Sequence, residues 1–171
     1  MKKIQLLIIF LTATLFIAGC SGAKTDNHST TAGDFILHKD KINSIEIVEV
    51  SAKVEKASDL VGPGPLTLSN SFDISSLTSQ LEEIPVKKLT TEEDIDFMKN
   101  RILADGFLEI GLNGEDKYLV SRQGMFFIWP DGVIYIVDIE SMNSNLRTIS
   151  YLSESKYPEI YKWLINKAKN L

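Results

Sequence analysis

Apolar residues are densest between positions 106 and 138, in the stretch GFLEIGLNGEDKYLVSRQGMFFIWPDGVIYIVD. This stretch holds four strand-like runs separated by Asn113-Gly114, Gln123-Gly124 and Asp131-Gly132. Asn-Gly between apolar runs favours a tight hairpin, because both residues tolerate positive φ. Pro-Asp-Gly suits a type I turn that is followed by a left-handed glycine. The pattern predicts an antiparallel meander of about four strands over residues 107–138.

Two shorter patterns precede the meander. INSIEIVEVSA, which starts at Ile42, alternates well enough to predict a strand with one mainly polar face. Two Gly-Pro pairs then indicate a loop, and Leu66 and Leu68 indicate a second short strand. The sequence therefore adds one or two N-terminal strands to the meander.

Three segments have the periodicity of amphipathic helices. The first begins near Asp73, a candidate N-cap, and stops before Pro85. The second begins with Thr90 and Glu93, which fit a capping box. The third begins near Ser155 and Pro158 and runs to the C-terminus. Their apolar stripes are Ile74, Leu77, Leu81 and Ile84; Ile95, Met98 and Ile102; and Ile160, Leu164, Ala168 and Leu171.

These elements predict an α+β fold in a single domain over residues 35–171. An antiparallel meander of about four strands, with one or two N-terminal strands, packs against two or three helices. The C-terminal amphipathic helix is one of them.

The last two strands of the meander lack a polar face. Met125, Phe127 and Trp129 point one way, and Phe126 and Ile128 point the other way. Either the N-terminal strands or the second helix cover the second face, or part of it, formed by Phe127, Trp129 and Tyr135, is a bare surface for a partner. Covering is the favoured interpretation, because large exposed apolar patches are uncommon on monomers.

The N-terminus reads MKKIQLLIIFLTATLFIAGC. Two lysines precede an apolar run from Ile4 to Ala18, which is shorter than the ~20 residues that a membrane-spanning helix needs. The end of this run resembles the lipobox of bacterial lipoproteins. The resemblance implies that Ile17, Ala18 and Gly19 form the signal-peptidase recognition stretch. It also implies that Cys20, the one cysteine of the chain, receives a diacylglyceryl group.

The expected mature protein is anchored in the membrane by lipid at the outer face of the bacterial cytoplasmic membrane. Residues 1–19 are then a signal peptide, and residues 20–34 are the lipidated cysteine and a flexible polar tether. Loss of Lys2 and Lys3 leaves 16 basic against 23 acidic residues, a formal charge of −7. Such an acidic domain is a poor candidate for binding nucleic acid.

The mature part also resembles a group of small, functionally uncharacterised lipoproteins of low-GC Gram-positive bacteria. The matching pieces are IEIVEV, FDISSLTSQL, FLEIGLNG, FFIWPDGVIYIV and the last helix. They cover most of residues 43–171. They consist mainly of core positions and turn glycines, so the resemblance implies no activity.

The sequence offers few groups for catalysis. His28 and His38 lie in the tether and at the edge of the domain, and no nucleophile elbow or phosphate-binding loop is present. Ser153 and Lys156 fit an S-x-x-K spacing without its companion motifs. Asp131 and Asp138 are the nearest candidates for a carboxylate pair. We therefore expect no catalytic, metal-binding or cofactor-binding residues.

Three functions remain open. The favoured one is a non-enzymatic protein-interaction module, such as an adaptor, inhibitor or accessory protein at the membrane or cell wall. The alternatives are a small-ligand-binding or sensor lipoprotein and a cell-wall hydrolase. An exposed aromatic patch would support the first, a pocket between helix and sheet the second, and a buried carboxylate of raised pKa the third.

Overall fold

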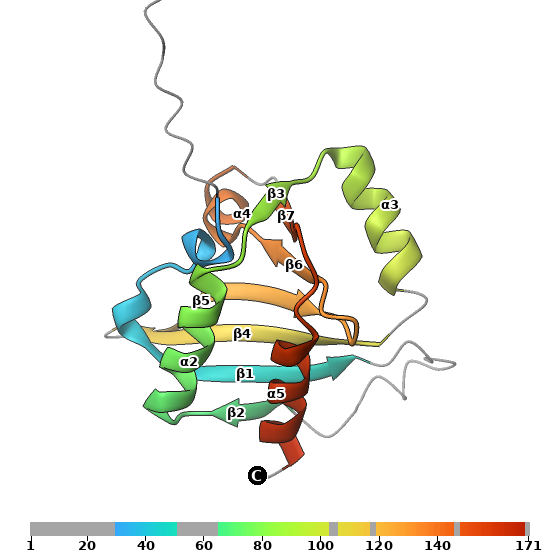
Figure 1. Cartoon of the computed structure of the whole chain (residues 1–171). Coiled ribbons are helices and arrows are strands. Elements are labelled where there is room, and N and C mark those ends of the chain that lie inside the picture. Colours follow the sequence, from blue (N-terminus) through green and yellow to red (C-terminus); the bar gives the residue numbers. More distant parts are fainter. Residues whose placement is uncertain (1–29, 51–64, 103–105, 117–118, 146–147, 170–171) are drawn as a thin grey trace, which may run out of the picture.

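The structure is a computed structural model that describes residues 30–50, 65–102, 106–116, 119–145 and 148–169. Within these residues the chain forms one seven-stranded antiparallel sheet in the order β2-β1-β4-β5-β6-β7-β3, with helices on both faces (Figure 1). The strands are β1 (Ile42–Val50), β2 (Leu66–Leu68), β3 (Val86–Lys88), β4 (Phe107–Asp116), β5 (Leu119–Ile128), β6 (Ile134–Val137) and β7 (Ser150–Ser153). The helices are α2 (Ser71–Glu82), α3 (Thr91–Ile102), α4 (Ile139–Asn145) and α5 (Pro158–Lys169), with 3-10 turns η1 (Ala32–Phe35) and η2 (Lys39–Lys41).

The α+β class and the antiparallel meander are confirmed, but two of the three expected turns are wrong. Strand β4 continues through Asn113-Gly114 without a turn, and strand β5 continues through Gln123-Gly124 in the same way. Leu112 pairs with Gly124 and Asn113 pairs with Arg122, so Gln123 is the extra residue of a β-bulge. Residues 107–138 therefore contain three strands, and β7 supplies the fourth strand of the meander.

The third expected turn, at Pro130-Asp131-Gly132, is confirmed. The Gly132 N–H donates to the Trp129 carbonyl at 2.8 Å, and Gly132 has φ +86°. A Cβ on Gly132 would lie 2.3 Å from the carbonyl carbon of Tyr157, so no side chain fits there. This turn reverses the chain between β5 and β6 and lets the start of α5 pack closely against it.

Helices α2 and α5 cover the first face of the sheet. Ile74, Leu77 and Leu81 of α2 are buried as expected, and so are Ile160 and Leu164 of α5. The expected N-cap is wrong, because Asn70 accepts the Phe72 N–H at 2.8 Å and caps α2. The Asp73 carboxylate instead pairs with Lys167 of α5 at 2.6 Å, and this ion pair joins the two helices.

Helix α3 covers the second face of the sheet at β5 and β6. Its expected capping box is present: the Thr90 N–H donates to Glu93 at 2.8 Å, and the Glu93 N–H donates back to the Thr90 hydroxyl at 3.2 Å. The Phe97 ring stacks on Tyr135, with centroids 5.6 Å apart, and meets Trp129 edge-on at 5.1 Å. The expected stripe is wrong at Ile95, which is 47% exposed.

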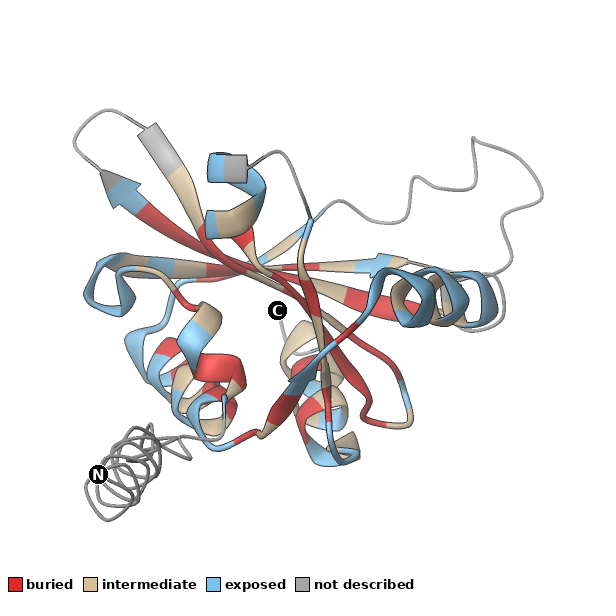
Figure 2. Cartoon of the chain, turned by 90° about the horizontal axis from the view of Figure 1, so that it is seen from above, coloured by how far each residue is buried: buried red, intermediate tan, exposed pale blue. Residues whose placement is uncertain are grey.

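The aromatic residues considered for a bare surface lie mainly inside the molecule. Trp129 and Tyr135 are 1% and 2% exposed, and Phe127 is half-buried against Phe107 and Tyr135. Figure 2 shows the buried residues concentrated along the sheet and on the sides of the helices that face it. The second face of β5 and β6 is thus covered, and Trp129 and Tyr135 form no exposed patch.

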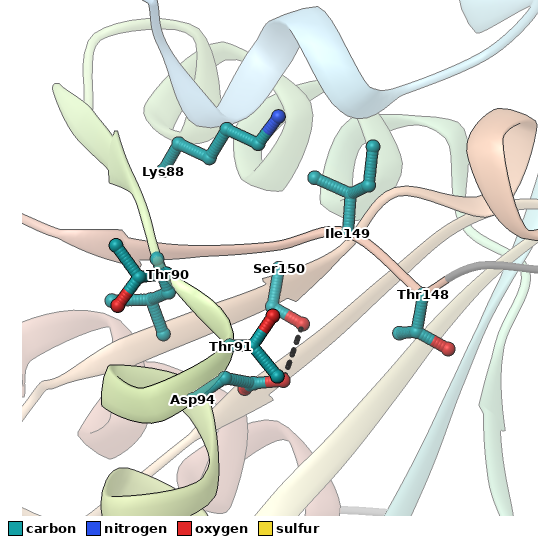
Figure 3. A pocket seen from close by; sticks show the side chains of 8 residues that line it. Lys88, Thr90, Thr91, Asp94, Thr148, Ile149 and Ser150 are labelled. Carbon is teal, nitrogen blue, oxygen red and sulfur yellow. Dashed lines mark hydrogen bonds between the residues drawn. The ribbon is translucent and has the colours of Figure 1, made fainter.

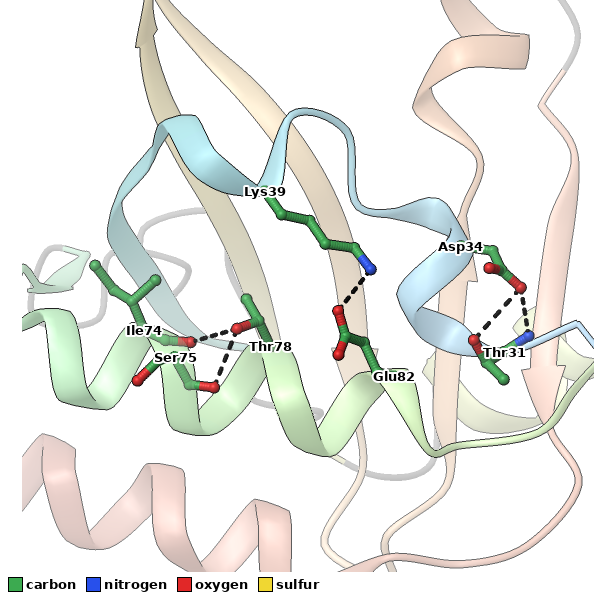
Figure 4. Close-up of polar contacts among 7 residues, drawn as sticks. All are labelled: Thr31, Asp34, Lys39, Ile74, Ser75, Thr78 and Glu82. Carbon is green, nitrogen blue, oxygen red and sulfur yellow. Dashed lines mark hydrogen bonds and ion pairs between the residues drawn. The ribbon is translucent and has the colours of Figure 1, made fainter.

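The described chain begins at the free edge of β3. The Val86 N–H donates to the Thr30 carbonyl and the Ala32 N–H donates to the Ile84 carbonyl, both at 2.9 Å. Asp34 accepts the Thr31 N–H at 2.8 Å, and Lys39 pairs with Glu82 at 2.7 Å (Figure 4). Residues 31–34, which the sequence analysis assigns to the tether, are therefore part of the fold.

Replacing Trp129 with alanine should destabilise the domain severely. The side chain is 1% exposed and packs against two other aromatic rings. The expected loss in the free energy of unfolding is about 3–5 kcal/mol, measured by urea denaturation. Phe72→Ala is the matched control, since Phe72 is 73% exposed, and it should change stability by less than about 0.5 kcal/mol. Equal effects of the two variants would contradict the placement of Trp129.

Candidate functional site

A pocket of about 490 Å³ opens between the start of α3 and the chain that leads into β7. This size is typical of small-ligand sites. Both polar and apolar side chains line it (Figure 3). The lining residues are Lys88, Leu89, Thr90, Thr91, Asp94, Thr148, Ile149 and Ser150. We call this the α3–β7 pocket.

Two of the lining residues, Asp94 and Ser150, form a hydrogen-bonded set with the buried Tyr135 behind them. The Tyr135 hydroxyl lies 2.7 Å from Asp94 Oδ1 and 2.6 Å from Ser150 Oγ. The Ser150 hydroxyl also lies 3.5 Å from Asp94 Oδ2. Because Ser150 and Tyr135 are buried, these contacts satisfy hydroxyls that would otherwise lose their hydrogen bonds to water.

The Tyr135 hydroxyl stays protonated at neutral pH. Burial raises the pKa of Tyr135 to about 12, and the neighbouring Asp94 carboxylate acts in the same direction. The hydrogen bond with Ser150 acts in the opposite direction and is outweighed. Tyr135 is therefore a neutral donor that orients the Asp94 carboxylate, not a base.

Two opposite charges in the pocket lining lack a partner of opposite charge. Among the described residues, neither Lys88 nor Asp94 forms an ion pair. In contrast, the residues next to them in the chain do form an ion pair, because Lys87 pairs with Glu93 at 3.4 Å. Lys88 is exposed to solvent and lies on the side of β3 opposite to Lys87, so the half-buried Asp94 carboxylate is the charge that the α3 side of the pocket leaves without a counter-ion.

Asp94 was not predicted from the sequence to be a site residue. An acid in the first turn of a helix is explained well enough by the helix dipole. The missed signal is its spacing, because Asp94 precedes Phe97 and Met98 by three and four residues. These three residues share one face of α3, and Phe97 and Met98 pack on the sheet. An acid on the buried stripe of a helix needs polar partners, which Tyr135 and Ser150 provide.

A second polar cluster lies on the same face of the sheet, across β1, β4 and β5. The Arg122 guanidinium pairs with Glu109 at 2.9 Å and with Glu46 at 3.2 Å. It lies against Gly111, where an added Cβ would come within 2.7 Å of Arg122 Cζ. The one guanidinium bridges the two carboxylates and ties three strands together, so the cluster is explained by its structural role.

The carboxylates proposed for hydrolysis are both occupied by structural contacts. Asp131 pairs with Arg101 at 2.9 Å and with Lys156 at 2.8 Å. Asp138 accepts the Ser141 N–H at 3.0 Å and the Ser141 hydroxyl at 2.6 Å at the start of α4. The two are thus held by different partners at the two ends of β6.

The S-x-x-K residues also have separate structural contacts. The Ser153 Oγ accepts the Ile134 N–H at 3.0 Å, whereas Lys156 pairs with Asp131 at 2.8 Å. Neither contact brings the lysine amine to the serine hydroxyl. His38, one of the two histidines, is exposed at the N-cap of η2.

The lipobox residues Ile17, Ala18, Gly19 and Cys20 lie outside the described residues. Across residues 30–50, 65–102, 106–116, 119–145 and 148–169, no helix has the length and apolar character needed to span a membrane. In the same ranges, no three metal-ligating side chains of His, Cys, Asp or Glu converge.

Comparison with protein-family models, with curated proteins and with solved structures finds no match to this chain.

In the Asp131→Asn variant, the free energy of unfolding should fall less than in the wild type as the pH is lowered from 4 to 2. Although burial raises it, hydrogen bonds from Lys156 and Arg101 lower the pKa of Asp131 to about 2, from 3.8. The depressed pKa contributes stability above pH 4 that is lost as the pH falls towards 2. Unfolding of the variant should therefore depend less on pH over that range.

Urea denaturation at a series of pH values measures this slope. Asp40→Asn, at an exposed position, controls for the loss of one carboxylate. If the free energy of unfolding falls equally with pH in the wild type and in Asp131→Asn, the ion-paired geometry of Asp131 would be contradicted.

Proposed function

We propose that this protein is an extracytoplasmic lipoprotein, anchored through Cys20, whose domain binds a small polar ligand in the α3–β7 pocket. The observation that carries the ligand-binding part is Asp94, a half-buried carboxylate that has no ion-pair partner among the described residues and lines a pocket of about 490 Å³. Unpaired charges that remain in a concave site favour a complementary ligand.

The membrane anchor is supported by the sequence around Cys20. A positively charged start, a short apolar run and the lipobox-like IAGC are found in that order. No other cysteine is present, so Cys20 has no disulfide partner within the chain. Two acyl chains on one residue are enough for stable membrane anchoring.

The anchor would keep the pocket near the membrane. The described chain begins at Thr30, which is hydrogen-bonded to Val86 at the edge of β3, and Lys88 ends the same strand. A random coil as long as residues 21–29 spans roughly 17 Å by square-root scaling. The ligand would therefore meet the protein close to the membrane surface.

Binding fits the pocket better than catalysis. A serine nucleophile needs a base that accepts its proton, and the imidazole that usually serves is missing from this set. Ser150 instead shares its hydrogen bonds with a protonated tyrosine and a carboxylate that is 3.5 Å away. The three side chains form a fixed polar wall, which suits recognition.

A protein-interaction module is the second candidate. The buried state of Trp129 and Tyr135 removes the support that an aromatic patch would have given. Ile95 on α3 and Met142 on α4 are nevertheless large apolar side chains that are 47% and 40% exposed. The two helices that carry them would be the first place to look for a contact surface.

Filling the pocket should abolish ligand binding without unfolding the protein. Thr91 is exposed at the rim, so Thr91→Trp adds bulk there at little cost in stability. In a screen of small polar metabolites, hits should raise the melting temperature of the wild type and leave that of Thr91→Trp unchanged. Phe72→Trp, remote from the pocket, is the control. Hits that stabilise all three proteins equally would contradict the site.

Cys20→Ser should release the protein from the membrane. The serine hydroxyl is not the lipid acceptor, so radiolabelled fatty acid should be incorporated into the wild type and not into the variant. Ser21→Ala is the control and should remain labelled. Labelling that persists in Cys20→Ser would contradict the anchor.

The same pair of proteins tests the second candidate. In a crosslinking pull-down from native membranes, one protein enriched only by the lipidated form would support an interaction module. Its loss in an Ile95→Ser or Met142→Ser variant would place the contact surface on α3 or α4.

A further inference from the structure

We infer that the ligand of the α3–β7 pocket is an organic amine, bound through its ammonium group by the Asp94 carboxylate. This inference rests on the proposed ligand-binding function and adds the chemical class of the ligand. It follows from three features of the α3 side of the pocket. These are the charge on Asp94, the shortage of hydrogen-bond donors around it, and the apolar surface that lines the same pocket.

Neither lysine of β3 compensates the charge of Asp94. Lys87 lies opposite Leu152, which packs with the aromatic residues under α3, and its ammonium group pairs with Glu93 at 3.4 Å. Lys88 is exposed and lies on the other side of the strand. Among the described residues, Asp94 therefore forms no ion pair.

The N-terminus of α3 supplies only part of the missing charge. The dipole of a helix is equivalent to roughly half a positive charge at its N-terminus. The acids of the first turn, Glu92, Glu93 and Asp94, share this partial charge. Among the described residues, Glu93 is the one of these acids that pairs with a lysine. The start of α3 is thus left with an excess of negative charge, which attracts a cation.

The hydrogen bonds around Asp94 leave acceptor positions empty. A carboxylate has about four acceptor positions, whereas Tyr135 and Ser150 carry one hydroxyl proton each. These two protons must also serve the contact of 2.6 Å between the hydroxyls themselves. The set of three side chains is therefore short of donors. A primary ammonium group has three N–H donors, so it supplies both the missing protons and the missing charge.

The carboxylate is held in a fixed orientation before any ligand binds. Tyr135 and Ser150 are 2% and 3% exposed, and the Tyr135 ring stacks on Phe97 of α3. Figure 3 shows the hydrogen bond that joins Asp94 of α3 to Ser150 of β7. Because packing restrains both hydroxyls, little freedom remains for the carboxylate to lose on binding, and such preorganisation favours affinity.

The pocket also has room for the organic part of an amine. Leu89 and Ile149 contribute apolar surface to its lining, and Leu89 packs with the aromatic residues under α3. Asp94 is the one carboxylate among the lining residues. A dedicated Ca²⁺ site usually offers several carboxylates at short range. A volume of about 490 Å³ with one carboxylate and apolar walls therefore suits an organic cation better than a metal ion.

The test is isothermal titration calorimetry on the full lipidated protein in phosphatidylcholine nanodiscs, with empty nanodiscs as the blank. The probes share one phenylalkyl body: 2-phenylethylamine, trimethyl(2-phenylethyl)ammonium, 2-phenylethanol and 3-phenylpropionate. The amine has both a positive charge and N–H donors, whereas the quaternary ammonium has the charge alone. The alcohol is neutral, and the acid has the opposite charge. The amine should bind, and each of the other probes should bind about 10-fold more weakly or worse. This comparison uses the wild type, so it does not depend on the folding of a variant.

Two variants locate the ammonium group. Asp94→Asn removes the charge and keeps an acceptor for the Tyr135 hydroxyl. It should weaken binding of the amine about 10-fold or more, to the level of the alcohol. Asp94→Glu keeps the carboxylate and should keep the preference for the amine over the alcohol. Asp96→Asn removes an exposed acid of the same helix outside the pocket lining, so it is the matched control and should bind the amine like the wild type.

The outcomes separate this inference from the proposed function. Equal binding of the amine and any of its three analogues, or amine binding that survives Asp94→Asn, would overturn the inference. Calcium chloride is titrated as well, and Ca²⁺ binding that Asp94→Asn abolishes, without amine binding, would replace the amine by a metal ion. A neutral or anionic metabolite that binds the wild type and not Thr91→Trp, with no amine binding, would overturn the amine and keep the pocket. No binding of any metabolite or probe to the wild type would overturn the proposed function itself.

Discussion

Strands β5 and β6 are apolar on both faces, and this constraint organises the whole domain. All four residues of β6 are buried, and in β5 Phe126 and Phe127 point to opposite sides of the sheet. Both faces of such a sheet must be covered by other elements. Helices α2 and α5 cover one side over the length of β1, β4 and β5, and α3 covers the aromatic residues on the other side. In the chain, α3 lies between β3, at one edge of the sheet, and β4, in its interior.

The α3–β7 pocket follows from the same constraint. Covering β6 with α3 buries Tyr135, and a buried phenol needs a hydrogen-bond partner. Asp94 and Ser150 meet that need from α3 and β7. The carboxylate that satisfies the tyrosine is itself left without a counter-ion among the described residues. The packing of an aromatic side chain thus produces a charged recognition group at the edge of the sheet.

Elements whose signals are local could be predicted from the sequence. Features that depend on residues brought together only by the fold could not. The capping box at Thr90, the Pro-Asp-Gly turn and the buried stripe of α2 could be predicted because each depends on residues within one or two turns. Gly114 and Gly124 resembled turn residues, but they serve close packing. A Cβ on Gly114 would come within 2.9 Å of the Lys41 carbonyl oxygen, and one on Gly124 within 2.8 Å of the Phe126 ring. The pocket also joins segments that are 56 residues apart, from Asp94 to Ser150, and no local pattern announces such a pair.

The attachment of the first described residues has a mechanical consequence. Two backbone hydrogen bonds, from Val86 to Thr30 and from Ala32 to Ile84, hold this segment to the edge of β3. Tension on the proposed anchor would pull first on the hydrogen bond of Thr30 and then on that of Ala32. The hydrogen bonds between the strands would be strained only after these two had broken. Release of residues 30–36 would lengthen the chain by at most roughly 24 Å. Because Ala32 and Ile36 are buried in the main core, the same release would uncover core side chains together with the edge of β3.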